Sequence, residues 1–254
     1  MINLTIDGRN IEAAEELTIL QVARRENIDI PTLCHHDALE PSGACRLCTV
    51  EVTVRKRTRF VTACNYVIMD GMDVKTASHE VTEVRKMILE LLLARCPGVK
   101  AIKDLAKSYG VERPRFELEN ETCILCGLCV RVCAEIVGAR AINLVSRGVD
   151  TRIDTPFHLP SEVCIGCGAC AAICPTGSIQ LKYTEDKVEI KPFNTVVDLR
   201  KCVSCGKHLA SDEQLISVSG KLGRLGGLAL LCGDCKRQKE SVALADGVRF
   251  LKNT

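Results

Sequence analysis

The chain has 254 residues, with 34 basic and 32 acidic side chains and a formal net charge of +2. This near balance predicts neither a nucleic-acid partner nor attachment to an anionic membrane surface. Tryptophan is absent and aromatic residues make up 3% of the chain, whereas cysteine occurs 17 times. The length allows one large domain or two to three small ones, and the cysteine clusters favour several small domains organised around metal.

The amino terminus, MINLTIDGRNIEAAEELTIL, carries acidic residues early and lacks the basic and apolar regions of a secretion signal. The longest apolar run, near MILELLLA, is too short to span a bilayer. We therefore expect a cytoplasmic protein with no membrane span. Because thiols stay reduced in that compartment, the clustered cysteines are predicted to be metal ligands rather than disulfides.

Residues 1–78 combine strand, helix and cysteine-loop patterns. The stretches INLTIDG and RNIEAA predict two strands around an Asp-Gly turn. Thr18 can cap a helix through ILQVARREN, and TVEVTVRKRTRFVTA predicts a β-hairpin. Two strands, a helix, a cysteine loop and a hairpin follow one another in the order of a β-grasp ferredoxin.

The cysteines of this first domain match a [2Fe–2S] site, with an isolated thiol, a close pair and a distant fourth thiol. Plant-type [2Fe–2S] domains use this order with a shorter first gap, so the longer gaps here indicate another branch of the fold. His35 and His36 raise the alternative of a Rieske site, but with four cysteines present we interpret both histidines as loop residues. The predicted ligands are Cys34, Cys45, Cys48 and Cys64.

Residues 79–118 are predicted to be a helical linker. Apolar residues recur at helical spacing in HEVTEVRKMILELLLARC, and Pro97-Gly98 ends that helix. A second short helix is expected in AIKDLAKSYGV. Cys96 stands alone in the linker, and we expect a half-buried structural cysteine there rather than a ligand.

Residues 119–195 contain two similar runs, CILCGLCVRVC from Cys123 and CIGCGACAAICP from Cys164. In ferredoxins with two cubane clusters, the fourth cysteine of each run ligates the other cluster. Zinc is the alternative, since it also binds four thiolates, but zinc sites use separated pairs. The first run has Ala134 where the pattern has proline, and only the second keeps it, in Pro175. The predicted sets are Cys123, Cys126, Cys129 and Cys174 for the first [4Fe–4S] cluster, and Cys133, Cys164, Cys167 and Cys170 for the second.

Residues 196–254 hold two separated cysteine pairs, CVSCGK and CGDC, with 26 residues between them. Such pairs resemble the knuckles of a zinc ribbon, in which two hairpins hold one ion; a further iron–sulfur cluster is the alternative. The stretch GKLGRLGG lacks the order of a dinucleotide-binding or phosphate-binding loop, and we expect it to be a turn. The predicted ligands are Cys202, Cys205, Cys232 and Cys235.

Together these patterns predict an α+β chain: a β-grasp [2Fe–2S] domain, a helical linker, a bacterial-type 2[4Fe–4S] domain and a zinc-ribbon-like module. Residues 1 to about 185 resemble the small iron–sulfur subunits of NAD(P)-linked hydrogenases and formate dehydrogenases, and the amino-terminal part of the large electron-transfer subunit of complex I. Relatives in this family commonly carry a His-plus-three-Cys cluster in the linker. Here only Cys96 remains, so the resemblance implies a rerouted or shortened electron path.

The resemblance implies an electron-transfer subunit in a hetero-oligomer rather than an enzyme with its own catalytic residues. Its partners would be a flavoprotein that holds FMN and binds NAD(P)H, and a hydrogenase or dehydrogenase subunit or soluble ferredoxin. Some relatives take part in electron bifurcation, and that activity is implied by analogy alone. The alternative function is a structural or redox-sensing iron–sulfur adaptor.

Overall fold

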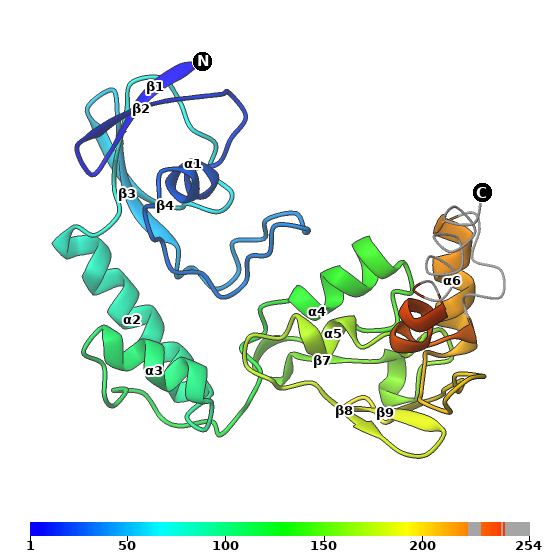
Figure 1. The fold of residues 1–254 in the computed structure, drawn as a ribbon. Helices are drawn as coiled ribbons and strands as arrows, with labels where there is room; N and C mark the ends of the chain where they lie inside the picture. The colour runs from blue at the N-terminus through cyan, green and yellow to red at the C-terminus, as the bar shows by residue number, and fades with distance from the viewer. Residues whose placement is uncertain (223–229, 240, 242–254) are drawn as a thin grey trace, which may run out of the picture.

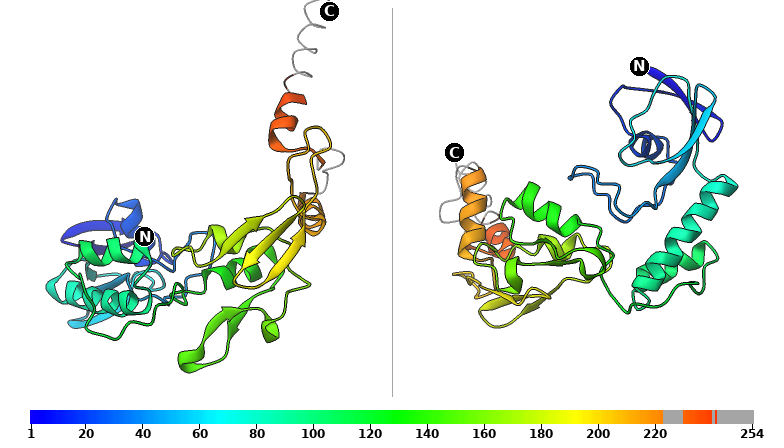
Figure 2. Two further views of the ribbon diagram at one scale, coloured as in Figure 1. Left: turned by 90° about the horizontal axis from the view of Figure 1, so that it is seen from below. Right: turned by 180° about the vertical axis from the view of Figure 1, so that it is seen from behind.

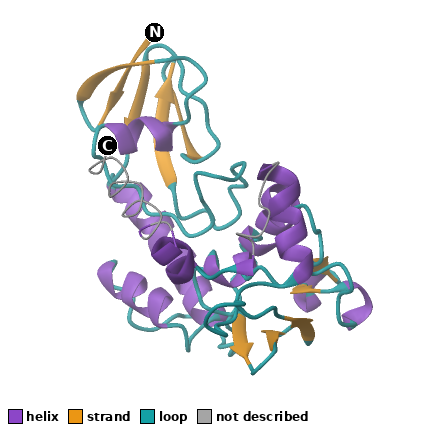
Figure 3. Cartoon of the chain, turned by 45° about the vertical axis from the view of Figure 1, so that its right-hand side comes forward, coloured by secondary structure: helices purple, strands orange, loops and turns teal. Residues whose placement is uncertain are grey.

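A computed structural model of the chain describes residues 1–222, 230–239 and 241. Figure 1 shows the amino-terminal sheet and the helix at residues 212–222 at opposite ends of the molecule. Helices α2 (His79–Arg95) and α3 (Lys100–Ser108) lie between the two strand-containing regions (Figures 1 and 3).

The amino-terminal hairpin pairs β1 (Ile2–Ile6) with β2 (Arg9–Ala13) in antiparallel register. Asp7 and Gly8 connect the strands with φ angles of 49° and 77°. Both angles lie in the left-handed region that a two-residue hairpin turn requires. The predicted hairpin is thus confirmed, and its Asp-Gly turn is the local cause.

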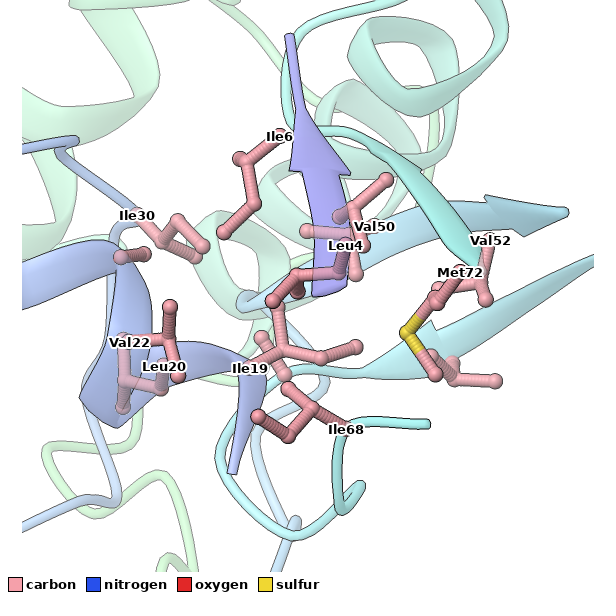
Figure 4. Packing of buried hydrophobic residues seen from close by; sticks show 14 of the residues in the cluster. Leu4, Ile6, Ile19, Leu20, Val22, Ile30, Val50, Val52, Ile68 and Met72 are labelled. Atoms are coloured by element: carbon pink, nitrogen blue, oxygen red, sulfur yellow. The ribbon is translucent and has the colours of Figure 1, made fainter. Parts of the chain in front are cut away.

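Helix α1 (Ile19–Arg25) begins at the predicted cap. Thr18 accepts a hydrogen bond from the backbone N–H of Gln21, and the Gln21 side chain accepts one from the N–H of Thr18. This reciprocal capping box satisfies two N–H groups at the helix start. The buried side chains of α1 pack against the sheet, as Figure 4 shows for Ile19, Leu20 and Val22.

A five-stranded sheet has the order β2-β1-β5-β3-β4. Strands β3 (Thr49–Val54) and β4 (Arg57–Thr62) form the predicted hairpin, and β5 (Met72–Lys75) lies between β1 and β3. The β1–β5 pair is parallel and the other pairs are antiparallel. A mixed sheet covered by one helix is the architecture expected for a β-grasp domain.

The linker consists of α2 (His79–Arg95) and α3 (Lys100–Ser108). Ser78 caps α2 by accepting a hydrogen bond from the N–H of Val81, and the helix ends before Pro97, as predicted. The two helices pack on each other through buried apolar side chains. Cys96 belongs to this core and is fully buried, whereas we expected it to be half-buried.

The region of the two cysteine runs contains short helices: α4 (Leu128–Arg131), the π-helix η1 (Val132–Val137) and α5 (Ala169–Ala172). Between the runs lie β6 (Asn143–Val145), η2 (Gly148–Asp150), β7 (Arg152–Asp154) and η3 (Pro156–His158), with β6 and β7 paired. The first run stays helical beyond Cys133 because Ala134 keeps the backbone N–H that a proline lacks. With Ala134 in place of proline, the backbone after the first run therefore differs from the backbone after the second.

A three-stranded antiparallel sheet, in the order β10-β9-β8, follows the second run. Its strands are β8 (Gln180–Tyr183), β9 (Lys187–Lys191) and β10 (Thr195–Asp198). We had not expected this sheet. Strand β10 also crosses the domain boundary that we placed between residues 195 and 196, because its buried Thr195 pairs with β9.

The carboxy-terminal region keeps only the first of the two predicted hairpins. The first knuckle is a tight hairpin with an antiparallel bridge between Lys201 and His208, in which the N–H of Cys202 donates to the Lys207 carbonyl oxygen at 2.8 Å. A helix, α6 (Asp212–Leu222), follows it, and residues 233–239 are also helical. Ser211 caps α6 by accepting from the N–H of Gln214, so local capping favours a helix.

The expected turn at GKLGRLGG is therefore wrong at its start, since Gly220, Lys221 and Leu222 belong to α6. The rest of that stretch, residues 223–227, lies outside the described residues. Within the part of the chain that the structure describes, no helix has the length and apolar character needed to cross a bilayer.

Candidate iron–sulfur centres

The four cysteines of the amino-terminal domain are all buried. Cys34 and Cys45 lie in the long loop before β3, Cys48 directly precedes β3, and Cys64 follows β4. The backbone N–H of Cys45 donates to Cys34 Sγ at 3.3 Å. The β3–β4 hairpin brings Cys64 back to Cys48, since the N–H of Ala63 donates to the Cys48 carbonyl oxygen.

These thiols form two hydrogen-bonded pairs. The Cys45 thiol donates to Cys34 and, with backbone N–H groups, lowers the pKa of Cys34 to about 5 despite burial. The Cys64 thiol likewise lowers the pKa of Cys48 to about 7. The pKa values of the donor thiols, Cys45 and Cys64, are raised instead. Ionising either donor would break its hydrogen bond to the other thiol of the pair and bury a charge. Buried thiolates beside N–H donors form a donor set that suits a [2Fe–2S] cluster.

The two histidines after Cys34 make contacts within their own loop. His35 Nε2 lies 3.1 Å from Asp37 Oδ1, and His36 Nδ1 accepts a hydrogen bond from the N–H of Ala38. These contacts agree with our interpretation of both histidines as loop residues. Their absence from the ligand set stays a prediction.

Four cysteines from both runs line one cavity of about 280 Å³. Three come from the first run and the fourth is the last cysteine of the second run. Burial raises the pKa of Cys126 to about 11 and of Cys129 to about 12, and burial together with the neighbouring Cys174 raises the pKa of Cys123. The cavity is lined by Cys123, Cys126, Cys129 and Cys174.

A second, largely apolar cavity has the reciprocal composition. Three of its cysteines come from the second run, and Cys133 ends the first. Burial, followed by its cysteine neighbours, raises the pKa of Cys170 to about 12. The thiols are Cys133, Cys164, Cys167 and Cys170, so each cavity collects the four-thiolate donor set of a cubane cluster.

The two runs share their backbone geometry. Gly127 and Gly168, which precede α4 and α5, both have φ = 72°. The position after the isoleucine is also left-handed in both runs, with φ = 53° at Leu125 and 66° at Gly166. In the first run, the N–H of Leu125 donates to Cys123 Sγ at 3.4 Å. Left-handed residues turn the backbone around the sulfurs and point N–H groups toward them.

The [2Fe–2S] loop contacts the first run directly. One buried apolar cluster contains Cys34 and Cys45 together with Cys126, Leu128 and Val132. Cys34 is close enough to contribute to the raised pKa of Cys126. Figure 1 shows the loop extending from the amino-terminal sheet toward α4. The first two thiol sets are therefore neighbours without an intervening domain.

Arg131 holds this contact. It lies in α4, and its Nη2 donates to the Cys34 carbonyl oxygen at 2.9 Å, while Nη1 donates to the carbonyl oxygen of Glu40. The N–H of Glu40 donates in turn to the Glu135 carboxylate. Sequence reasoning missed Arg131, because a single arginine between Cys129 and Cys133 carries no local signal of a partner almost a hundred residues away.

The linker core contains no second ligand beside Cys96 among the described residues. Val99, Ile102 and Ala106 of α3 pack there against Leu89 and Leu93 of α2. Burial raises the pKa of Cys96 to about 11. A single thiol in an apolar core supplies too few ligands for an iron–sulfur cluster.

The carboxy-terminal cysteines form a compact group. Their four Sγ atoms all lie within 4.8 Å of one another, and Cys205 Sγ is 3.5 Å from Cys232 Sγ. Backbone N–H groups, first that of Cys232, lower the pKa of Cys202 to about 6. Bond lengths of about 2.3 Å around a tetrahedral zinc place sulfurs about 3.8 Å apart. A cubane holds its thiolates farther apart, since each binds a different iron.

The carboxy-terminal module is attached beside the second cavity. Ser211, fully buried, donates from Oγ to the Ile165 carbonyl oxygen at 2.6 Å. Ile165 lies between two cysteines of the second run. Figure 2 shows this module at the end of the molecule farthest from the amino-terminal sheet. The thiol sets therefore follow one another from one end of the chain to the other.

Comparison with known families gives two matches. Residues 1–79 match the family described as "2Fe-2S iron-sulfur cluster binding domain", and residues 163–209 match the "4Fe-4S dicluster domain". The second match includes the second run with Cys202 and Cys205 but leaves out the first run. The structure groups the thiols differently from this match. Cys174 lines a cavity with cysteines of the first run, whereas Cys202 and Cys205 lie beside Cys232 and Cys235. The fold and the matches define an iron–sulfur protein built from ferredoxin domains.

The names of three similar proteins all refer to NADH, NADPH or NAD+. The chain is 40% identical over 183 aligned positions to "NADPH-Fe(3+) oxidoreductase subunit alpha" of Geobacter sulfurreducens, covering 61% of this chain and 21% of that protein. It is 34% identical over 180 positions to "NADH-ubiquinone oxidoreductase 75 kDa subunit" of Reclinomonas americana, covering 61% and 26%. A solved structure of an NAD+-reducing [NiFe]-hydrogenase has a chain with a TM-score of 0.53 and 28% identity, covering 61% of this chain and 74% of that one.

The chain is thus similar to a subunit of NADH-ubiquinone oxidoreductase and to a chain of an NAD+-reducing hydrogenase, the resemblance that the cysteine motifs predicted. It spans about a fifth to a quarter of the length of the curated relatives that it matches.

Proposed function

We propose that the chain relays electrons between a flavoprotein subunit, which holds FMN and binds NAD(P)H, and a hydrogenase or dehydrogenase subunit or ferredoxin. The observation that carries this proposal is the row of three complete thiol sets in which each set contacts the next. A protein that needed one cluster for shape would not require such a row. The unpaired cysteines also support a reducing, cytoplasmic location within a hetero-oligomer.

The ligand assignment follows from the cavities and thiol pairs. One [2Fe–2S] cluster would bind to the amino-terminal set, and two [4Fe–4S] clusters would bind to the crossed sets of the two runs. Each cluster supplies one-electron redox chemistry when bound. The assigned sets are Cys34, Cys45, Cys48 and Cys64; Cys123, Cys126, Cys129 and Cys174; and Cys133, Cys164, Cys167 and Cys170.

The protein's part in the relay is to fix the spacing of these sets and keep water away. The apolar cluster around Cys34 and Cys126 excludes solvent between the first two sets, and Arg131 holds the loop in place. Cys129 and Cys170 share the apolar cluster between the two cubane sets. Because the linker core has no ligand set, the proposed path runs directly from the first set to the second.

The carboxy-terminal thiol set is proposed to bind one zinc ion. The short separations among its four sulfurs support a single tetrahedral metal. Zinc has no accessible second oxidation state, so this site would be structural. Its place beside the second run supports a role in docking a neighbouring subunit, because a small module that folds around metal keeps most of its surface exposed.

The test of the relay uses the chain together with the flavoprotein that copurifies with it. Under anaerobic conditions, NADH or NADPH should bleach the iron–sulfur absorbance rapidly when the flavoprotein is present and not when it is absent. Flavoprotein stripped of FMN is the matched control. If the copurifying flavoprotein failed to reduce the clusters, the structural or redox-sensing adaptor would be the better function.

A further inference from the structure

Arg85 is a buried cation in the middle of α2. It is 4% exposed and lies between Val81 and Leu89, one helical turn away on either side, both of which are fully buried. This face of α2 packs against β3 and the apolar cluster of the linker. An arginine in such a stripe is unexpected, since arginine is almost never buried unless it is paired.

The hydrogen bonds of Arg85 go to neutral groups. Nη2 donates to the Thr49 carbonyl oxygen at 2.9 Å, and Nη1 lies 3.4 Å from Tyr109 Oη. Its Nε is buried without a partner. No carboxylate among the described residues forms an ion pair with Arg85, although 15 ion pairs occur elsewhere in this part of the chain.

An unpaired buried cation is strongly unfavourable, so a negative partner is expected. Glu51, two residues along β3 from Thr49, is already bonded to Ser78 and Lys75, so the candidate is the amino-terminal thiol set. Thr49, which binds Arg85, is joined directly to Cys48, and Leu89 belongs to the same apolar cluster as Cys34 and Cys45. Two ferric ions, two sulfides and four thiolates sum to a formally dianionic site.

We propose that Arg85 is the buried counter-ion of the [2Fe–2S] site and a positioning residue that makes this site easier to reduce. The proposal rests on the ligand set assigned above. Gaining one electron makes the site trianionic, and a fixed buried cation stabilises that added charge more than the oxidised state. Salt screens a buried pair poorly, so the effect persists at physiological ionic strength.

Arg131 donates to the loop that holds Cys34, and its Nε is likewise buried without a partner, but the residue as a whole is more exposed than Arg85. It is only half-buried, and its two bonds to carbonyl oxygens hold the loop against α4. Solvent near Arg131 weakens its field at the cluster. Arg85 has no comparable exposure, so it is the better candidate for an electrostatic role.

The test measures midpoint potentials by EPR-monitored redox titration of the full chain with its clusters. Arg85→Gln should shift the [2Fe–2S] potential to more negative values and leave the two [4Fe–4S] potentials unchanged. Arg85→Lys, which keeps the charge, should retain most of the wild-type potential. Lys86→Gln on the same helix is the control, since Lys86 is exposed and pairs with Glu83.

A second pair of variants keeps the proposal testable if Arg85→Gln does not fold. Tyr109→Glu places a carboxylate within reach of Arg85 and should lower the [2Fe–2S] potential, whereas Tyr109→Gln should not. Equal shifts in Tyr109→Glu and Tyr109→Gln would overturn the proposed role of Arg85 and leave the ligand assignment in place. An unchanged potential in Arg85→Gln with the cluster intact would do the same. A wild-type protein without a [2Fe–2S] signal would instead overturn the ligand assignment and this proposal together.

Discussion

Arg131 Nη2 donates a hydrogen bond to the backbone oxygen of Cys34 at 2.9 Å and so joins the helix between two cubane ligands to the loop of the amino-terminal thiol set. The two residues are 97 positions apart in the chain. This single side chain therefore spans the boundary between the first two proposed clusters.

Arg131→Met should loosen the loop after Cys34 and slow electron exchange between the [2Fe–2S] site and the first [4Fe–4S] site. Hydrogen bonds from a charged donor contribute about 1.5–3 kcal/mol each, so the loop should also become more sensitive to proteolysis. Laser-triggered reduction with optical detection measures the exchange, and the exposed Arg147→Met is the control. An unchanged exchange rate with a normally protected loop would show that Arg131 does not hold the contact.

The crossed ligand sets predict which spectra should look alike. Cys174→Ser should damage the same cluster as Cys126→Ser, and Cys133→Ser should damage the same cluster as Cys167→Ser, because each cavity contains one thiol of the other run. EPR spectra of the four reduced variants compare them directly. The crossing would be refuted if Cys174→Ser instead matched Cys167→Ser.

Metal analysis should find about ten irons and about one zinc per chain, from one [2Fe–2S] cluster, two [4Fe–4S] clusters and one tetrahedral site. Replacing both Cys232 and Cys235 with serine should remove the zinc, weaken subunit assembly and leave the iron content and EPR signals unchanged. About fourteen irons in the wild type, or loss of an EPR-active centre in the variant, would identify the last site as a cluster.

Gly127 and Gly168 provide a matched pair because both have φ = 72°. A side chain in this region costs about 1–2 kcal/mol, so alanine should destabilise both positions. A Cβ at Gly168 would also lie 2.8 Å from Leu181 Cδ1, whereas one at Gly127 would meet no atom within 4 Å. Urea unfolding of the cluster-loaded protein should show the larger loss for Gly168→Ala. Equal losses would mean that Leu181 moves aside freely.

The cysteine spacings alone predict the types of cluster, since a short gap between thiols restricts which metal groups one loop can surround. Local signals were equally informative for the Asp7-Gly8 turn and the Thr18 cap, because each acts within a few residues. For the same reason, the two linker helices follow from the spacing of apolar residues. The domain types required no knowledge of distant contacts.

Tertiary structure decided how these parts meet. The direct contact between the first two thiol sets, the unpaired burial of Arg85 and the attachment of Ser211 to Ile165 all join residues far apart in the chain. Helix α6 replaced an expected hairpin for a related reason: paired CxxC motifs specify a metal site but leave the intervening chain undetermined. Local spacing thus indicated the four thiol sets and the cluster types of the first three, whereas long-range packing determined which set is the neighbour of which, because packing depends on the whole folded chain.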